Sequence, residues 1–128
     1  MSYFWIFFGG GLGSIARFAF AGFIDRQFGG TFPWGTLLVN ISGSFAIGLV
    51  GTPTQPSGGE TLAPNFRTFF MVGVCGGYTT FSSFSLQTLS LARNGEWLSA
   101  GANCVFSLVL CLFAVWLGHV LALKLGSA

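Results

Sequence analysis

The chain has 128 residues, of which 52% are hydrophobic and only 6% are charged. A soluble domain has about a quarter of its residues charged, and without them it would expose more apolar surface than water tolerates. The composition therefore excludes a cytosolic enzyme and a disordered chain, and it predicts that a lipid bilayer surrounds most of the surface. The net charge of +2 includes no basic run that would suit a nucleic acid.

Four apolar stretches are long enough to cross a bilayer as helices. A transmembrane helix needs about 20 mostly apolar residues, and the four stretches are residues 4–24, 34–51, 66–92 and 97–123. The segments between them hold the helix breakers and most of the charges, which is typical of polar turns. We therefore predict an all-α membrane protein with four transmembrane helices in a single domain, residues 1–128.

Two glycine pairs have the spacing typical of close helix packing. Gly9 and Gly13 lie four residues apart in the first stretch, and Gly73 and Gly77 have the same spacing in the third. Small residues at this spacing let the backbones of two membrane helices approach each other closely. We expect both pairs to lie in contacts between helices.

Polar residues follow one another at intervals of four in the second and last stretches. They are Thr36, Asn40 and Ser44, and then Ser99, Asn103, Ser107 and Cys111. Residues at this spacing share one face of a helix, and a polar face is costly against lipid, so it must meet a neighbouring helix or a pathway. Both alternatives stay open for the serines. An asparagine is harder to satisfy in mid-membrane, and we favour a functional role for Asn40.

The middle of the third stretch is a poor helix former. Between Gly76 and Ser83, two glycines are followed by four Thr and Ser residues. Because lipid cannot satisfy free backbone groups, a break at this depth must lie inside protein or beside a polar cavity. A helix that ends there offers carbonyls to a small cation, and one that starts there offers amides to an anion. We predict a break over residues 76–80, and the alternative is a continuous helix notched by glycine.

Two phenylalanines follow the predicted break. The chain has 16 phenylalanines, most of which we interpret as lipid-facing bulk, but Phe81 and Phe84 lie three residues apart among hydroxyl residues. The edge of an aromatic ring carries partial positive charge and can stabilise an anion without a full opposite charge. This arrangement suits a conductor, because an ion must be able to leave as well as enter.

The acidic residues argue against active transport. Asp25, Glu60 and Glu96 all lie in the predicted connections, whereas a proton-coupled exporter needs a carboxylate or a histidine inside the membrane. His119 lies near the end of the last stretch, where we interpret it as an interfacial residue. The missing carboxylate therefore favours a passive conductor over a small multidrug-type transporter, and the predicted polar break argues against a noncatalytic assembly subunit. The sequence indicates no enzyme chemistry.

The distribution of the basic residues favours neither orientation of the chain in the membrane. Arg67 and Lys124 would lie on one side of the bilayer, and Arg26 and Arg93 on the other. The side with more Lys and Arg residues in short loops usually stays in the cytoplasm. With two basic residues on each side, both orientations are possible, and we therefore expect an antiparallel, dual-topology homodimer.

Three strings of residues closely resemble the motifs of the Fluc (CrcB) family of bacterial fluoride channels. They are the strings from Gly13 to Arg17, from Pro33 to Asn40 and from Gly76 to Ser85. The resemblance covers all four predicted helices. It implies an antiparallel homodimer in the bacterial plasma (inner) membrane, with two fluoride pores and a sodium ion at the two-fold axis. The expected function is a fluoride-selective, passive ion channel that lets the cell lose fluoride and so lowers its toxicity.

The resemblance also implies roles for single residues. Asn40 would line the pore, Thr36 would lie near its mouth, and the two phenylalanines would turn their ring edges to the ion. Fluoride is a small, strong hydrogen-bond acceptor, so amide and hydroxyl donors would replace its water. The residues that we expect along the fluoride pathway are Thr36, Asn40, Phe81, Ser82, Ser83, Phe84, Gln87, Asn103 and Ser107.

The resemblance also implies a sodium site and a structural residue. The sodium ion of the family is held by backbone carbonyls, which match Gly76 and Thr79 of each subunit. A structural arginine of the first helix matches Arg17.

Two residues depart from the family pattern. The usual glutamate near a vestibule is Gln87, and a common aromatic residue of the last helix is Asn103. Both keep hydrogen-bonding capacity, so we expect conduction to be retained.

Overall fold

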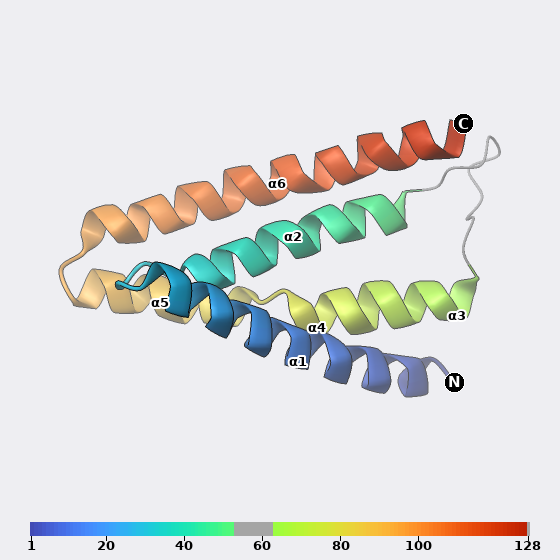
Figure 1. Ribbon diagram of the computed structural model, residues 1–128, viewed down its shortest axis with the longest axis horizontal. Helices are drawn as coiled ribbons and strands as arrows, with labels where there is room; N and C mark the ends of the chain where they lie inside the picture. Colours follow the sequence, from blue (N-terminus) through green and yellow to red (C-terminus); the bar gives the residue numbers. More distant parts are fainter. Residues whose placement is uncertain (53–62, 128) are drawn as a thin grey trace.

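The structure is a computed structural model that describes residues 1–52 and 63–127, most of which are helical (Figure 1). The helices are α1 (Ser2–Phe28), α2 (Trp34–Gly51), α3 (Pro64–Arg67), the π-helix η1 (Thr68–Cys75), α4 (Gly76–Tyr78), α5 (Phe81–Arg93) and α6 (Trp97–Ser127). The all-α prediction is confirmed, since the described residues contain no strand. Glu60, which we placed in a polar turn, lies outside these residues.

Three helices are long and apolar enough to cross a membrane. They are α1, α2 and the part of α6 over Trp97–Gly126. Both α1 and α6 extend beyond the predicted stretches, 4–24 and 97–123. Together with the apolar surface of these helices, this length makes the chain a multi-pass membrane protein.

The end of α1 differs from the prediction. We expected Asp25 and Arg26 in a connection, but both belong to α1. The helix continues because its breakers, Gly29 and Gly30 with φ of 65° and 74°, come only after these residues. The Asp25 carboxylate then accepts a hydrogen bond of 2.8 Å from the backbone N–H of Gly35, in the first turn of α2. This places a negative charge at the helix N-terminus, which is favourable.

The third predicted stretch, residues 66–92, is covered by one continuous helical run over residues 64–78, which comprises α3, η1 and α4, and by a second helix, α5. Helix α4 ends at Tyr78, and α5 begins after two extended residues, Thr79 (φ −82°, ψ 155°) and Thr80 (φ −150°, ψ 123°). We expected non-helical backbone from Gly76 onward, but Gly76 to Tyr78 are helical. A pair of adjacent glycines is therefore tolerated in this helix, and the extended backbone is confined to the two threonines.

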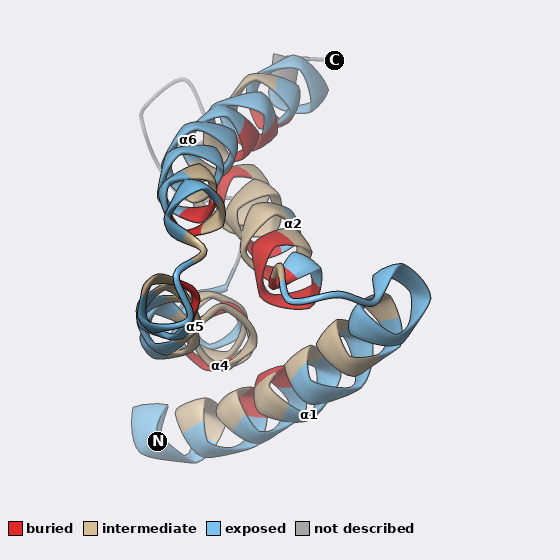
Figure 2. Ribbon diagram, turned by 90° about the vertical axis from the view of Figure 1, so that its left-hand side faces the viewer, coloured by how far each residue is buried: buried red, intermediate tan, exposed pale blue. Residues whose placement is uncertain are grey.

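The long helices run back and forth along the long axis of the molecule, and both chain termini lie at the same end (Figure 1). Helix α2 packs mainly on α6, α1 packs on η1 and α4, and α5 packs on α6. Viewed from one end, most of α1 and α6 is exposed (Figure 2). This exposed surface is rich in Phe, Leu and Val, which suits lipid or a protein partner in the membrane.

The contact between α1 and the third stretch is built from glycine. Gly9 and Gly13 of α1 lie against the backbone around Gly73 and Gly77. A Cβ atom added to Gly9 would lie 3.0 Å from the Cα of Gly73, and one added to Gly13 would lie 2.9 Å from the nitrogen of Tyr78. The predicted packing role of both pairs is confirmed. We call these four glycines the glycine seam.

Candidate functional site

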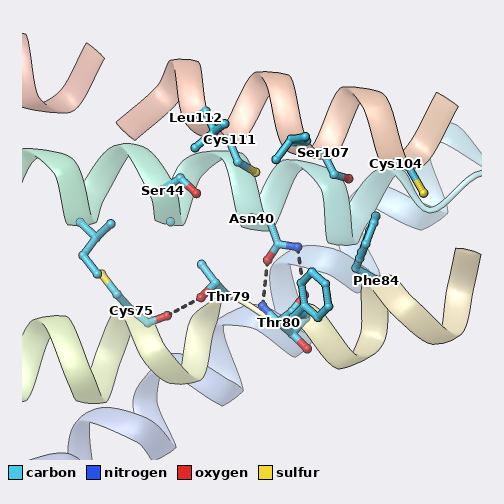
Figure 3. A pocket seen from close by; sticks show the side chains of 14 residues that line it. Asn40, Ser44, Cys75, Thr79, Thr80, Phe84, Cys104, Ser107, Cys111 and Leu112 are labelled. Atoms are coloured by element: carbon cyan, nitrogen blue, oxygen red, sulfur yellow. Dashed lines mark hydrogen bonds between the residues drawn. The ribbon is translucent and has the colours of Figure 1, made fainter. Parts of the chain in front are cut away.

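A cavity of about 510 Å³ lies between α2, the extended threonines, α5 and α6 (Figure 3). Polar and sulfur-containing residues alternate around it with aromatic and aliphatic ones. Its polar and thiol lining consists of Asn40, Ser44, Cys75, Thr79, Thr80, Cys104, Ser107 and Cys111, and its aromatic lining consists of Phe81 and Phe84. The sequence therefore brings residues from four helical segments around one space on the side of the third stretch that faces α2 and α6.

The side chain of Asn40 makes two hydrogen bonds to the backbone of one extended residue, Thr80. The Asn40 Nδ2 donates to the Thr80 carbonyl at 3.0 Å, and the Thr80 N–H donates to Asn40 Oδ1 at 2.8 Å (Figure 3). The amide thus replaces the helical partners that an extended residue lacks. The side-chain nitrogen of Asn40 has two N–H groups, and only one of them is used in the bond to Thr80. The other N–H is free, within the described residues, on a residue that lines the cavity.

The two extended threonines are held in different ways. The Thr79 hydroxyl donates to the Cys75 carbonyl at 2.9 Å. The Thr80 hydroxyl oxygen accepts the N–H of Ser83 at 3.2 Å, which is an N-cap for α5. Each threonine therefore closes the end of one helix, α4 or α5, and the interruption between the helices is an ordered feature of the fold.

Two aromatic rings and a serine complete the wall of the cavity. Phe81 and Phe84 have ring centroids 5.3 Å apart with an interplanar angle of 47°. Phe81 is 78% exposed in the single chain, whereas Phe84 is half-buried. Ser107 lies across the cavity on α6 (Figure 3). The rings and the hydroxyl therefore face the same space from opposite sides.

The structure brings only part of the predicted pathway into this cavity. Asn40, Phe81, Phe84 and Ser107 line it, and so does Thr79, which we matched to the sodium site. Five other predicted pathway residues lie outside its lining: Thr36, Ser82, Ser83, Gln87 and Asn103. Whether any of these residues contacts fluoride stays a prediction.

The predicted residues outside the cavity have other surroundings. Thr36 is 7% exposed in the first turn of α2. The Ser82 hydroxyl lies 3.2 Å from that of Thr80. The Oε1 atom of Gln87 is buried and has no hydrogen-bond partner among the described residues. Gln87 thus leaves unused capacity to bind a polar group.

Arg17, on α1, also contacts the third stretch. Its Nε donates to the Gly77 carbonyl at 3.1 Å. Gly76, the neighbouring residue matched to the sodium site, is exposed in the single chain. The backbone just before the extended threonines is therefore contacted by a cationic side chain and is also open on the surface.

Several residues that line the cavity have no role predicted from the sequence. Thr80 is fixed by its pairing with Asn40, which lies 40 residues away and so leaves no local pattern. Cys104 and Cys111 lie three residues before and four residues after Ser107, so the spacing alone indicates that they share its face. Cys111 belongs to the polar face that we predicted for the last stretch, whereas we assigned no role to Cys104.

The cavity has donors for an anion but no fixed charge. None of its lining residues is acidic or basic. Among the described residues, no group of three His, Cys, Asp or Glu side chains comes together to hold a metal ion. Amide, hydroxyl and thiol donors and ring edges bind an anion weakly, which allows it to pass through.

Comparisons with known proteins agree with this chemistry. The family model described as CrcB-like protein, Camphor Resistance (CrcB), matches residues 4–119. A protein of Methylocella silvestris named fluoride-specific ion channel FluC is 54% identical over 127 residues, which are 99% of this chain and 97% of that protein. Proteins of the same name from Opitutus terrae and Rhodospirillum rubrum are 57% and 56% identical, over 98% and 99% of this chain and 95% and 98% of their own lengths. The chain belongs to the CrcB-like protein family.

Proposed function

We propose that this chain forms a fluoride-selective, passive ion channel of the bacterial plasma (inner) membrane, as a single four-helix domain. It lets fluoride leave the cytoplasm down its electrochemical gradient and so lowers the toxicity of fluoride to the cell. The observation that carries this proposal is the uncharged cavity lined by Asn40, Ser107 and two phenylalanines, in a chain that is 54–57% identical to proteins named as fluoride channels. A channel needs no catalytic step, so the protein is not an enzyme.

The lining of the cavity supports passive flow over coupled transport. A proton-coupled exporter of the small multidrug type needs a titratable group at its substrate site, and the cavity lining contains no carboxylate and no histidine. An anion in the cavity would meet the free N–H of Asn40, the Ser107 hydroxyl and the edges of two phenylalanine rings. A larger halide would fit these short contacts less well, which accounts for selectivity.

The backbone around the two threonines fits a structural sodium ion. The N–H of Thr80 goes to Asn40, so the carbonyl of Gly76, four residues earlier, lacks its usual helical partner. Carbonyl oxygens are suitable ligands for a hard monovalent cation, and we propose that Gly76 and Thr79 of each subunit hold sodium. The ion would supply positive field near the anion path without a titratable group.

The distribution of charge supports an antiparallel homodimer. Arg26 and Arg93 lie in the last turns of α1 and α5, which end at one end of the molecule, whereas Arg67 lies in α3 and Lys124 in the last turn of α6, at the other end (Figure 1). Neither end is favoured as the cytoplasmic one. Phe81 and Gly76 are exposed in the single chain, and a second, inverted copy would cover them and bring two sets of carbonyls together.

The purified protein reconstituted in liposomes tests the proposed function. Vesicles loaded with potassium fluoride or potassium chloride are diluted into ion-free buffer with valinomycin, and ion-selective electrodes follow the efflux. We expect fast fluoride efflux and little chloride efflux. Equal rates for the two ions, or fluoride efflux only with an imposed proton gradient, would contradict the proposal.

Variants with a forced orientation test the antiparallel dimer. Added basic residues next to Arg67 and Lys124 should favour one orientation, and added basic residues next to Arg26 and Arg93 the opposite one. Each variant alone should be inactive, and coexpression of the two should restore fluoride efflux. A variant of a single orientation with full activity would exclude the antiparallel assembly.

A further inference from the structure

Asn103 is the most completely buried polar side chain in the described part of the protein. It is 1% exposed on α6, and it does not line the cavity. Its Nδ2 donates to the Thr88 hydroxyl of α5 at 2.9 Å, and its Oδ1 accepts the hydroxyl of Ser107 at 3.4 Å. The amide therefore connects the neighbouring helix to a serine of the cavity wall.

The direction of these hydrogen bonds follows from the number of protons. The Thr88 hydroxyl donates its single proton to the Phe84 carbonyl at 2.8 Å, so toward Asn103 it can act only as an acceptor. This leaves Asn103 Nδ2 as the donor and Oδ1 as the atom that faces Ser107. The orientation of the buried amide is thus fixed by Thr88.

The Ser107 hydroxyl differs from two other helical hydroxyls, those of Ser85 and Thr88 on α5. These two donate to the backbone carbonyl four residues earlier, at 2.9 and 2.8 Å, and the hydroxyls of Thr52 and Thr79, which directly follow α2 and α4, do the same at 2.7 and 2.9 Å. Such back-bonding is common for Ser and Thr in or next to helices. The Ser107 hydroxyl instead points to the side chain of Asn103, and that bond is long. A bond of 3.4 Å is weak, so another acceptor can replace it.

We propose that Asn103 is a positioning residue of the ion pathway, which keeps the Ser107 hydroxyl off its own helix backbone and available as a donor to the anion. The inference rests on the proposed function, since it concerns how fluoride is bound in that same cavity. Thr88 anchors the amide from α5, so the availability of Ser107 depends on the contact between α5 and α6. Asn103 itself does not touch the ion.

Replacement of Asn103 by leucine keeps a similar volume and removes both hydrogen bonds. The Ser107 hydroxyl should then turn to the backbone carbonyl of residue 103, and fluoride flux per channel should fall about fivefold, the effect of one hydrogen bond. Ser107→Ala should reduce the flux by a similar factor. The double variant should conduct no worse than either single variant, because both remove the same donor.

A second pair of variants avoids any change in the buried asparagine. Thr88→Val removes the anchor and should lower fluoride flux, whereas Thr88→Ser keeps the hydroxyl and should restore it. Ser85→Ala is the matched control, because Ser85 makes the same bond to a carbonyl of α5 but none to α6 among the described residues. Its flux should equal that of the wild type.

The results separate a positioning role from a merely structural one. Flux is compared per folded dimer, with the thermal unfolding midpoint of each variant measured in the same detergent. Effects of Asn103→Leu and Ser107→Ala that multiply in the double variant would overturn the inference and leave the proposed function standing. So would a Thr88→Ser variant that conducts as poorly as Thr88→Val. A wild type that conducts no fluoride would overturn both.

Discussion

The third stretch presents two different faces to its neighbours. Toward α1 it offers the glycine seam, in which the backbones of the two segments lie close together. Toward α2 and α6 it offers the cavity, in which Asn40 reaches across to Thr80 and leaves space beside it. The first face is held by close van der Waals packing. The second leaves a space open, and its backbone groups at Thr80 are paired by the side chain of Asn40.

The two faces together allow the extended threonines to be tolerated in a membrane protein. Non-helical backbone is costly at membrane depth unless protein groups satisfy it. The glycine seam holds the segment firmly on one side, and an asparagine with two capping hydroxyls satisfies it on the other. Changes on the cavity side should therefore alter conduction, and changes on the seam side should alter folding.

The largest effect on conduction is expected from Asn40→Asp. Aspartate cannot donate to the Thr80 carbonyl, and it places a negative charge in the path of an anion. We expect fluoride flux in liposomes to fall by about a hundredfold or more, because an uncompensated like charge in a low-dielectric space is very unfavourable. Ser42→Ala, a change of an exposed hydroxyl on the same helix, is the control. Wild-type efflux from the Asn40→Asp variant would remove Asn40 from the pathway.

The glycine seam is tested by Gly13→Leu, with Gly11→Leu as a matched control. A Cβ at Gly13 meets the backbone of Val74 and Tyr78, whereas one at Gly11 meets nothing within 4 Å. We expect the Gly13 variant to lose about 1–3 kcal/mol of stability or to fail to fold, and the Gly11 variant to behave as the wild type. Thermal unfolding in detergent and size-exclusion chromatography measure this. Any folded Gly13 variant should keep its preference for fluoride over chloride, and a loss of that preference would contradict the division between the two faces.

A smaller effect is expected from Phe81→Ile and Phe84→Ile. Both changes roughly keep the side-chain volume but remove the positive ring edge, so fluoride flux should fall about fivefold, in line with the strength of aromatic edge contacts. The dimer should still assemble in detergent. Phe106→Ile, on the exposed surface of α6 outside the cavity, should conduct normally. Normal flux in both cavity variants would show that the rings serve only for packing.

The smallest effect is expected from Gln87→Glu. Gln87 lies outside the cavity lining, and its amide does not titrate, so it should add no pH dependence of its own. A glutamate there should change how fluoride enters, by about a factor of two to five, the range of a partly exposed charge. The ratio of fluoride to chloride flux should stay the same. A large change in that ratio would place Gln87 in the selectivity filter.

Much of the fold follows from the sequence alone. The long apolar stretches define α1, α2 and α6, because the thickness of the bilayer sets the length of a spanning helix. The glycine spacing predicts the seam, because two glycines four residues apart lie on one face of a helix. Each of these conclusions depends on residues that are close together in the chain.

The site depends on contacts between helices that are far apart in the sequence. The pairing of Asn40 with Thr80 and that of Asn103 with Thr88 join residues on different helices, so no local periodicity contains them. The confinement of the extended backbone to two threonines, with Gly76 still helical, also depends on that first asparagine. Local propensity marks a weak point in a helix, but the partner that satisfies its backbone groups determines where the helix opens.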